Sequence, residues 1–473
     1  MNWLLAWIVI YLVLILILSL RHIRVTDPEQ YLVNNRSTKL IPLLATTLAT
    51  FVGGGTSIGL MALGYESGFA AVGIGVAYVI GFFIMVKFAG KIRDFGAKNK
   101  IYSFPHYLNY IYTAEKYPGI SKVFSSTVSG VNIFIFFFML AAQFVAMASL
   151  LKFSFEIGYL PAAIISTLIV IFYTAVAGMS GVIITDLIQF IAILIMIVLI
   201  FIPGICEDTV YLSRLKELPS NMLNGTYYGY VFIIGLLVFL SWSVLVRLDI
   251  WQRILAAKDK RTARKTMLLT GLGMLPFYII FPLVGMAVRL TFTGVESPKD
   301  VAFHFINAHS SGFVFGFAII GMLSALMSTG DSFLNIISIS AVKDFRIKNK
   351  SVNLEKQSKK IRIVTVLFGT LALAIALIFP HIVDLLVVGL STITLFVPVT
   401  LFALINKNAG KYSDVALCSI LTGFIVNLAF FIYGVLFPEN FEAKSSFVPG
   451  FFVSTLIMIT GVLWKKSKIN VGE

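Results

Sequence analysis

Hydroxyl-bearing residues are concentrated in one apolar stretch of the chain, residues 311–341. At about 100° per residue, these residues would lie with Ala325, Asp331 and Asn335 on two adjacent stripes of a helix. One stripe has Ala325, Ser328, Thr329 and Ser332, and the other has Ser324, Asp331, Asn335 and Ser338. A polar half-face on a membrane helix must face protein, water or an ion. Hydroxyls supply neutral oxygen ligands, which suit a hard monovalent cation that binds and then leaves. Hydrogen bonds between helices are the alternative, and the size of the array favours a cation site.

Two carboxylates also lie deep within apolar stretches, Asp186 and Asp331. A charge at the centre of a bilayer costs roughly 3 kcal/mol on insertion scales, so each carboxylate needs a cation, a proton or an internal arginine as its partner. Coupling to an ion or a proton is the preferred interpretation. A purely structural, hydrogen-bonded carboxylate is the alternative.

Two apolar stretches carry residues that would interrupt a membrane helix. Three consecutive glycines, Gly53 to Gly55, predict an unwound segment, because close packing of helices usually places small residues four apart. The second stretch contains Ser241-Trp242-Ser243, followed by Arg247 and Asp249. Broken helices in corresponding positions of two halves indicate a transporter with inverted repeats and a binding site near the middle of the membrane.

Arg247 is the basic residue placed well inside a predicted span, and it could bind a carboxylate through two parallel hydrogen bonds. That would indicate an organic acid as substrate. The alternatives are an arginine that reaches towards the membrane surface or one that pairs with Asp249. Further candidates to line a substrate site are Thr56, Ser57, Gln143 and Trp242, each of which could equally be a packing residue.

The elements that must position these residues are membrane helices. The chain has 473 residues, of which 58% are hydrophobic and 12% charged, whereas soluble domains carry about 25% charged residues. This composition excludes a soluble enzyme, a nucleic-acid-binding protein and a disordered chain. Apolar runs of about 20 residues can cross a bilayer, and thirteen are found: 3–20, 40–63, 67–90, 124–151, 157–178, 181–203, 229–252, 266–289, 311–341, 363–380, 382–405, 413–437 and 448–464.

The distribution of basic residues predicts the orientation of these spans. The first span is read as uncleaved, because Arg21 and Arg24 follow its apolar run and no cleavage site does. With the N-terminus outside, the predicted inner segments hold 30 Lys and Arg and the outer segments hold 6. Because inner loops are the ones enriched in basic residues, we expect the N-terminus outside and the C-terminus in the cytoplasm.

Four stretches of the chain resemble the sodium:solute symporter family, whose members have the LeuT-type inverted-repeat fold. They are Ala49–Tyr65 (ATFVGGGTSIGLMALGY), Thr185–Gln189 (TDLIQ), Gln252–Lys258 (QRILAAK) and Ala325–Asn335 (ALMSTGDSFLN). The resemblance implies sodium-coupled uptake of a small solute. It also implies a sodium site made of the carbonyls of Ala49, Val52 and Ala325 and the hydroxyls of Ser328 and Thr329.

Some members of that family hold a second sodium near the positions that match Asp186, Asp331 and Ser332. Here Asp331 is a carboxylate where the compared members carry a hydroxyl, so the site could hold a sodium more tightly or share a proton. These three residues are therefore expected to form a second cation or proton site.

We expect residues 1–473 to be one polytopic transporter domain in the plasma membrane. Its parts would be an extra N-terminal span at 3–20, five-helix repeats at 40–203 and 229–405, and two extra spans within 413–464. The predicted function is sodium-coupled import of a small solute by alternating access, with a carboxylate-bearing solute favoured and with sodium, solute and lipid bilayer as partners. A proton-coupled transporter of the same fold and a transporter-like sensor are the alternatives. An enzyme is not expected, because the spans contain no nucleophile elbow, metal-ligand cluster or acid–base pair.

Overall fold

The computed structural model describes residues 3–21, 28–113, 118–292, 294–295, 297–345 and 354–471. Long apolar helices dominate these residues, and within them eleven helices are long and apolar enough to cross a membrane. Two further helix pairs, each bent at a short break, raise the number to thirteen. This confirms the predicted all-α membrane architecture with about thirteen spans.

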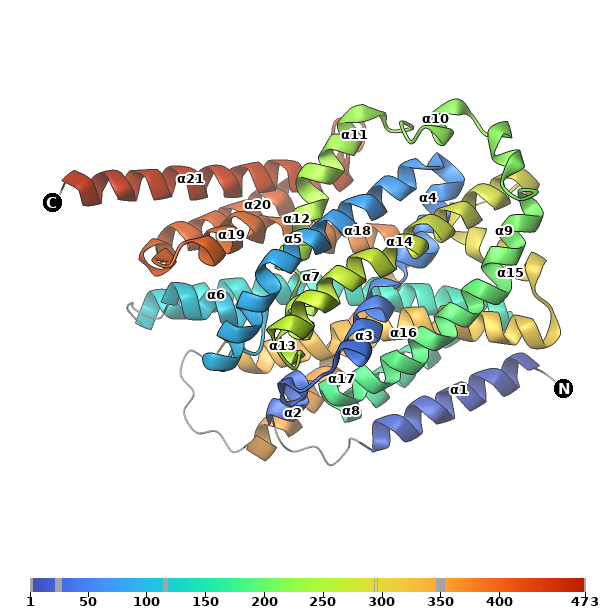
Figure 1. Cartoon of the computed structure of the whole chain (residues 1–473), viewed down its shortest axis with the longest axis horizontal. Helices are drawn as coiled ribbons and strands as arrows, with labels where there is room; N and C mark the ends of the chain where they lie inside the picture. The colour runs from blue at the N-terminus through green and yellow to red at the C-terminus, as the bar shows by residue number, and fades with distance from the viewer. Residues whose placement is uncertain are drawn as a thin grey trace.

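The long helices run side by side along the longest axis of the molecule (Figure 1). The helices that make up the candidate spans, alone or in series, are α1 (Trp3–Leu20), α3 (Leu40–Phe51), α4 (Leu60–Ser67), α5 (Ala70–Lys98), α7 (Pro118–Phe155), α8 (Tyr159–Met196), α9 (Ile202–Asp208), α11 (Gly229–Gly235), α12 (Ser241–Ser243), α13 (Leu248–Ala256), α14 (Lys260–Thr291), α16 (Gly312–Lys343), α17 (Leu354–Ile378), α18 (Ile382–Ile393), α19 (Val397–Ile405), α20 (Ser413–Leu436) and α21 (Phe447–Val471). Other helices between the spans include α2 (Pro28–Val33), α6 (Phe104–Thr113), α10 (Ser220–Leu223) and α15 (Val301–His309). Within α8, Gly178 has φ of +58° and divides the helix into two spans.

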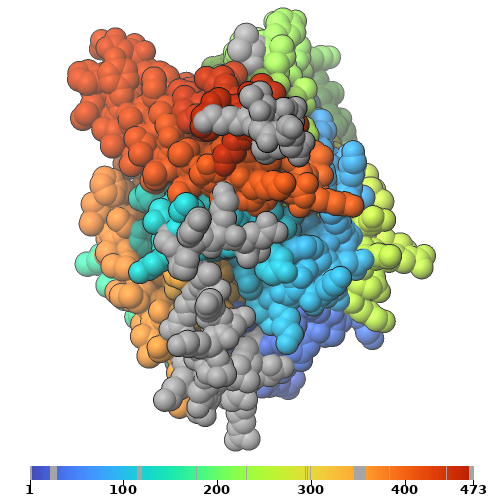
Figure 2. Space-filling model, turned by 90° about the vertical axis from the view of Figure 1, so that its left-hand side faces the viewer, coloured from blue at the N-terminus to red at the C-terminus, as the bar shows by residue number. Residues whose placement is uncertain are grey.

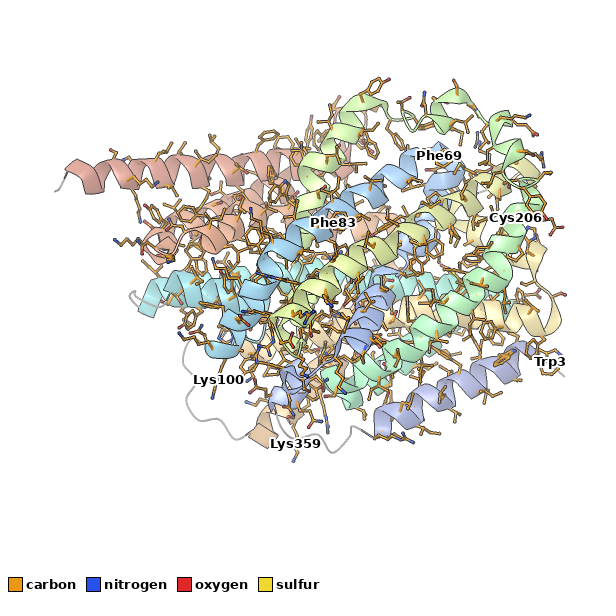
Figure 3. The ribbon with its side chains drawn as sticks, in the orientation of Figure 1. Trp3, Phe69, Phe83, Lys100, Cys206 and Lys359 are labelled. Carbon is orange, nitrogen blue, oxygen red and sulfur yellow. The ribbon has the colours of Figure 1, made fainter. Side chains whose placement is uncertain are left out.

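The two ends of the bundle differ in character. The N-terminus and the C-terminus lie at opposite ends, as an odd number of crossings requires (Figure 1). Lys100 and Lys359 lie towards the end where the C-terminus emerges, and Trp3 and Cys206 lie at the other end (Figure 3). We call the end where the C-terminus emerges the basic end. Seen from that end, the red C-terminal segments occupy one edge of the molecule (Figure 2).

The helix α16 forms the centre of the bundle. Its residues from Gly321 to Ser340 are buried without interruption, and the helix packs against α1, α7, α8 and α17. A second packed group joins α14 to α3, α4 and α5. There Gly64 permits close contact, because a Cβ at this position would lie 2.2 Å from the carbonyl oxygen of Pro282 in α14. Because α16 is buried from Gly321 to Ser340, the polar stripes predicted on residues 311–341 face protein.

Both predicted breaks are present. The first broken helix bends by 56° between α3 and the segment Gly55–Ser67, directly at the three glycines. The second bends by 46° between Phe232–Val246 and α13. At this second break Arg247 has an extended backbone, with φ of −75° and ψ of 120°, immediately before α13 begins.

At the basic end, main-chain hydrogen bonds join the two broken helices. Thr38, just before α3, forms an isolated parallel bridge with Ala257, just after α13. The bridge consists of the bonds Thr38 N to Ala256 O at 3.1 Å and Lys258 N to Thr38 O at 2.9 Å. The buried guanidinium of Arg93 in α5 donates to the carbonyls of Ala257 and Lys258. We call this arrangement the inner clasp.

Candidate functional site

The first cluster of polar atoms lies where the C-terminal end of α3 meets the middle of α16. The Ser328 hydroxyl lies 3.0 Å from the carbonyl oxygen of Ala49 and 3.1 Å from that of Ala325. The Thr329 hydroxyl lies 2.9 Å from the carbonyl oxygen of Thr50 and 3.1 Å from that of Ala325. All these residues are buried. Four of the five residues predicted for a sodium site thus converge from two helices.

Val52, the fifth of these residues, is the C-cap of α3, and its N–H bonds to the carbonyls of Leu48 and Ala49. The last carbonyls of a helix lack partners within it and carry partial negative charge. The break in the helix therefore turns its carbonyl end towards the two hydroxyls on α16. A cluster made only of neutral oxygens suits a hard cation such as sodium.

Gly53 is required for this contact between the break and α16. A Cβ at position 53 would lie 2.4 Å from the Thr329 hydroxyl oxygen and 2.8 Å from the Thr329 Cβ. Only glycine can bring the unwound backbone so close to α16. The next residue, Gly54, donates its N–H to the Gln143 side-chain oxygen of α7 at 2.8 Å. Two neighbouring helices therefore hold the break in place.

A second buried cluster surrounds the Arg253 guanidinium of α13. Its Nη2 donates to the hydroxyls of Thr50 at 2.6 Å and Ser332 at 2.7 Å, and it lies 3.6 Å from the Asp186 carboxylate. The same Asp186 oxygen accepts a hydrogen bond of 2.5 Å from Thr46. In the sequence, Arg253 belongs to the Gln252–Lys258 motif and directly follows the predicted span 229–252. The structure places its positive charge between two of the three residues expected to hold a second cation.

Asp331, the third of these residues, faces different neighbours. The Tyr173 hydroxyl of α8 donates to Asp331 Oδ2 at 2.9 Å and also lies 3.3 Å from the carbonyl oxygen of Met327. Consecutive helical residues are about 100° apart around the axis, so Ser332 faces α3 and α13 while Asp331 faces α8. Asp186 and Ser332 thus lie beside Arg253, while Asp331 is hydrogen-bonded by Tyr173.

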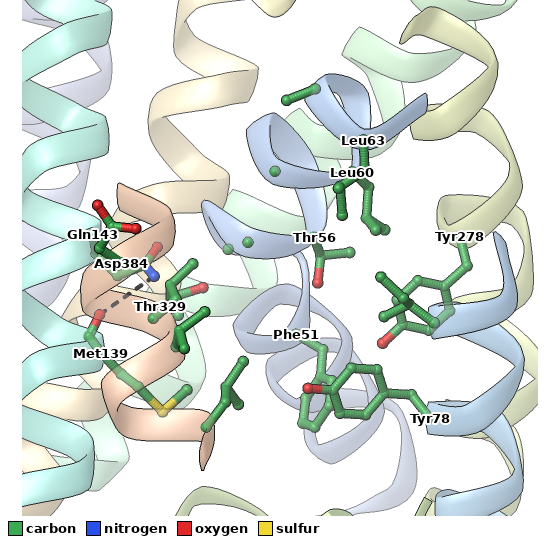
Figure 4. A pocket seen from close by; sticks show the side chains of 18 of the residues that line it. Phe51, Thr56, Leu60, Leu63, Tyr78, Met139, Gln143, Tyr278, Thr329 and Asp384 are labelled. Carbon is green, nitrogen blue, oxygen red and sulfur yellow. Dashed lines mark hydrogen bonds between the residues drawn. The ribbon is translucent and has the colours of Figure 1, made fainter. Parts of the chain in front are cut away.

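A cavity of about 450 Å³ lies beside the first break. Its walls come from both broken helices and from α5, α7, α14 and α18, and include Phe51, Thr56, Tyr78, Gln143 and Tyr278 (Figure 4). Thr329 also lines it, so the cavity and the first polar cluster share a wall. The size suits a small solute.

Three of the five predicted substrate residues line this cavity: Thr56, Gln143 and Arg247. Ser57 is buried, donates to the carbonyl of Gly53 at 3.0 Å and is not among the wall residues. Trp242 is half-buried against the apolar core and is likewise not among the wall residues.

Arg247 is already paired within the protein. Its Nε and Nη2 donate to the two carboxylate oxygens of Asp249 at 3.0 and 2.6 Å. Its guanidinium also lies over the Phe51 ring, 4.4 Å from the ring centre. The alternative in which Arg247 pairs with Asp249 is therefore the arrangement observed. A solute could still contact the guanidinium, because Arg247 forms part of the cavity wall.

The sequence does not predict the aromatic walls of the cavity. Tyr78 of α5 and Tyr278 of α14 stack with ring centres 6.0 Å apart and an interplanar angle of 8°. Nothing in their local sequence distinguishes them from the many aromatic residues that only fill the core. The exposed residues Glu66, His381 and Asp384 also contribute to the cavity wall.

A model of the sodium:solute symporter family matches residues 31–423 of this chain. The chain belongs to the sodium:solute symporter family. It is similar to sodium/proline symporter 2 of Staphylococcus saprophyticus subsp. saprophyticus, with 25% identity over 70% of this chain and 67% of that protein. It is also similar to a sodium/proline symporter of Staphylococcus aureus, with 25% identity over 72% of this chain and 69% of that protein.

Among solved structures, the chain resembles a substrate-bound, outward-open Na⁺-coupled sialic acid symporter. The TM-score is 0.76 and the identity 20%, over 98% of this chain and 97% of that one. A nucleobase-cation-symport-1 family transporter with bromovinylhydantoin bound gives a TM-score of 0.50 at 14% identity, over 93% of this chain and 95% of that one. These likenesses confirm the LeuT-type fold. The chain is a sodium-coupled symporter of a small solute in the membrane, and not an enzyme.

Proposed function

We propose that this symporter binds its coupling sodium between the carbonyls of Ala49, Val52 and Ala325 and the hydroxyls of Ser328 and Thr329. The observation that carries this proposal is the convergence of both hydroxyls on the carbonyl end of α3. Binding there would join the first broken helix to α16 and fix one wall of the cavity. This link between ion and solute site is what coupled transport requires.

The solute that we propose is a small organic molecule bearing a carboxylate. The cavity is lined by Gly53, Gly55 and Thr56, where the outer half of the first broken helix begins. Backbone N–H groups at the start of a half-helix favour an anionic group of a substrate. Thr56, Gln143 and the guanidinium of Arg247 would add side-chain contacts. The relatives named for proline and sialic acid, both carboxylates, support the same class.

Ser57 and Trp242 have supporting roles in this proposal. Ser57 ties the new helical turn to the carbonyl of Gly53. Trp242 packs beside the second break, on the segment that leads to Arg247. Neither needs to touch the solute to affect the shape of the cavity.

We also propose that the chain is one transporter domain with five-helix repeats at 40–203 and 229–405. Each repeat would begin with one of the two broken helices. The plasma membrane is the proposed location, with the N-terminus outside and the basic end in the cytoplasm. The positions of Lys100 and Lys359 at the end where the C-terminus emerges support this orientation.

Thermal stability of the purified protein in sodium or potassium tests ion and solute together. A ligand that binds only the folded protein raises the melting temperature by mass action. We expect a sodium-specific increase that becomes larger with one small carboxylate, such as proline, and not with its amide, which lacks the carboxylate. An equal response to the acid and the amide would contradict the carboxylate assignment. A response that is the same in sodium and potassium would contradict the sodium site.

A further inference from the structure

A second cavity, of about 260 Å³, lies towards the basic end of the molecule. It is enclosed by the last turns of α5, the helix α6 and the C-terminal end of α19, and it shares no wall residue with the solute cavity. Its wall is apolar at Ile92, Phe95 and Leu404 and polar at Lys91, Asn406 and Lys407. The cavity thus combines an apolar surface with basic side chains.

The charge at this second cavity is positive. Lys91 donates a hydrogen bond of 2.5 Å to the carbonyl of Leu404, which leaves two of its three ammonium hydrogens for a ligand. Lys407 is exposed, and no ion pair joins it or Lys91 to a carboxylate within the described residues. Among those residues no acidic side chain lines the cavity, and Asp94, one turn further along α5, is exposed. The cavity is therefore suited to an anion.

The position of Lys91 along α5 places the second cavity at the surface of the membrane. A helix needs about 20 residues to cross the hydrocarbon core, and α5 has 29. Counted from Ala70, the core ends just before Lys91, at the depth where the phosphates of lipid headgroups lie. Two exposed apolar side chains flank the cavity, Phe83 on α5 and Ile405 at the end of α19. The cavity is thus bordered by lipid-facing surface.

The inner wall of the second cavity contacts the second broken helix. Tyr107 of α6 lines the cavity and is buried. On its other side its ring packs against Trp251 of α13, with the ring centres 4.8 Å apart. Its hydroxyl lies 3.4 Å from the carbonyl of Ala403 in α19. A molecule in the cavity would therefore stabilise the packing of α6 between α13 and α19.

We propose that this second cavity binds the headgroup of an anionic phospholipid from the leaflet at the basic end. Lysines bind phosphate as point charges, and basic pockets between membrane helices bind anionic headgroups. The apolar wall would contact the glycerol backbone and the first carbons of the acyl chains, which a free phosphate ion lacks. This inference goes beyond the proposed function, because it uses none of the sodium or solute residues.

Lipid binding to the purified full-length protein, counted by native mass spectrometry during a titration, tests this inference. We expect the first phosphatidylglycerol to bind at least about fivefold more tightly than phosphatidylcholine, which has the same phosphate but no net charge. Equal affinities for the two lipids would overturn the proposal. Inorganic phosphate in large excess should not displace phosphatidylglycerol. Displacement by inorganic phosphate would assign the cavity to the free ion and overturn the lipid.

Three lysine variants show whether the lipid binds at this cavity. Lys91→Gln and Lys407→Gln should each weaken the first phosphatidylglycerol about fivefold. Lys98→Gln is the matched control, because Lys98 is exposed on the same helix and does not line the cavity. Lys407→Gln keeps the test available if Lys91→Gln, which loses the bond to Leu404, does not yield folded protein. An equal loss in Lys407→Gln and Lys98→Gln would show diffuse attraction to the surface and overturn the site.

Discussion

The contact between Gly53 and Thr329 gives a sharp prediction for Gly53→Ala. The added methyl would lie 2.7 Å from the Thr329 Cγ2 and 2.8 Å from its Cβ, whereas carbon atoms in contact are separated by about 3.5 Å or more. Thr329 or the break must therefore move by about 0.7 Å. Thr329 has little freedom to turn away, because its side chain is β-branched and buried within α16. The same methyl would lie 2.4 Å from the Thr329 hydroxyl oxygen, which is one of the proposed sodium ligands.

Overpacking of this kind costs about 1–3 kcal/mol. If that cost falls on the sodium-bound arrangement, the sodium concentration needed for half-maximal binding should rise by about 5- to 150-fold. The assay is the melting temperature of the purified protein across a sodium series, with choline keeping the ionic strength constant. The remaining share of the cost would lower the melting temperature in the absence of sodium.

Gly130→Ala is the matched control for this experiment. Gly130 lies within α7, and a Cβ there would have no heavy atom within 4 Å. Alanine is favoured over glycine inside a helix by up to about 1 kcal/mol, so the control should be as stable as the wild type or more so, with the same sodium response. A wild-type sodium response in Gly53→Ala, or an equal change in both variants, would refute the reasoning.

Three further predictions concern single side chains. Ser328→Ala should raise the half-maximal sodium concentration about 10-fold or more in the same assay, because hydrogen bonds to charged groups contribute about 1.5–3 kcal/mol. The control is Ser338→Ala on the same helix, whose buried hydroxyl donates to the carbonyl of Leu334 at 2.7 Å; a shift no larger than that of the control would count against this ligand. Arg247→Lys keeps the positive charge but loses the planar guanidinium that can form two parallel hydrogen bonds. It should therefore weaken binding of a carboxylate solute about tenfold and leave the sodium response unchanged. A wild-type solute affinity would show that Arg247 does not contact the solute. Burial and then nearby positive charges lower the pKa of His106 from 6.5 to about 4. The folded protein therefore favours neutral His106, whose stabilising contribution is complete above pH 6.5 and declines by up to about 3 kcal/mol as the pH falls towards 4. Melting temperatures from pH 7 to 4.5 should fall less for His106→Gln than for the wild type, and parallel curves would contradict this.

The fold could be predicted from the sequence because each of its signals is local. Apolar runs define the spans, and the glycines at 53–55 and the residues around Arg247 mark the two breaks. Ser328 and Thr329 could be identified because both lie on one helix, where spacing alone fixes the shared face. Their partner, the carbonyl end of α3, follows from the break itself.

The parts that escaped prediction depend on contacts between distant segments or on irregular backbone. In a regular helix Arg247 and Asp249, two positions apart, would point to different sides. They meet because Arg247 has an extended backbone just before α13. Arg253 looks like a residue at the edge of a span, yet it reaches hydroxyls 203 and 79 positions away along the chain. No periodic pattern carries that information.

The inner clasp has a consequence for how this protein can move. The bonds between Thr38 and the residues Ala256–Lys258, reinforced by Arg93, fasten the inner half of one broken helix to that of the other. Because main-chain hydrogen bonds join these two segments, we expect them to move together as one rigid unit at the basic end. This unit can rotate at two places, beside Gly53 and at Arg247, because helical hydrogen bonding is interrupted there. The same breaks that line the cavity would therefore serve as its hinges.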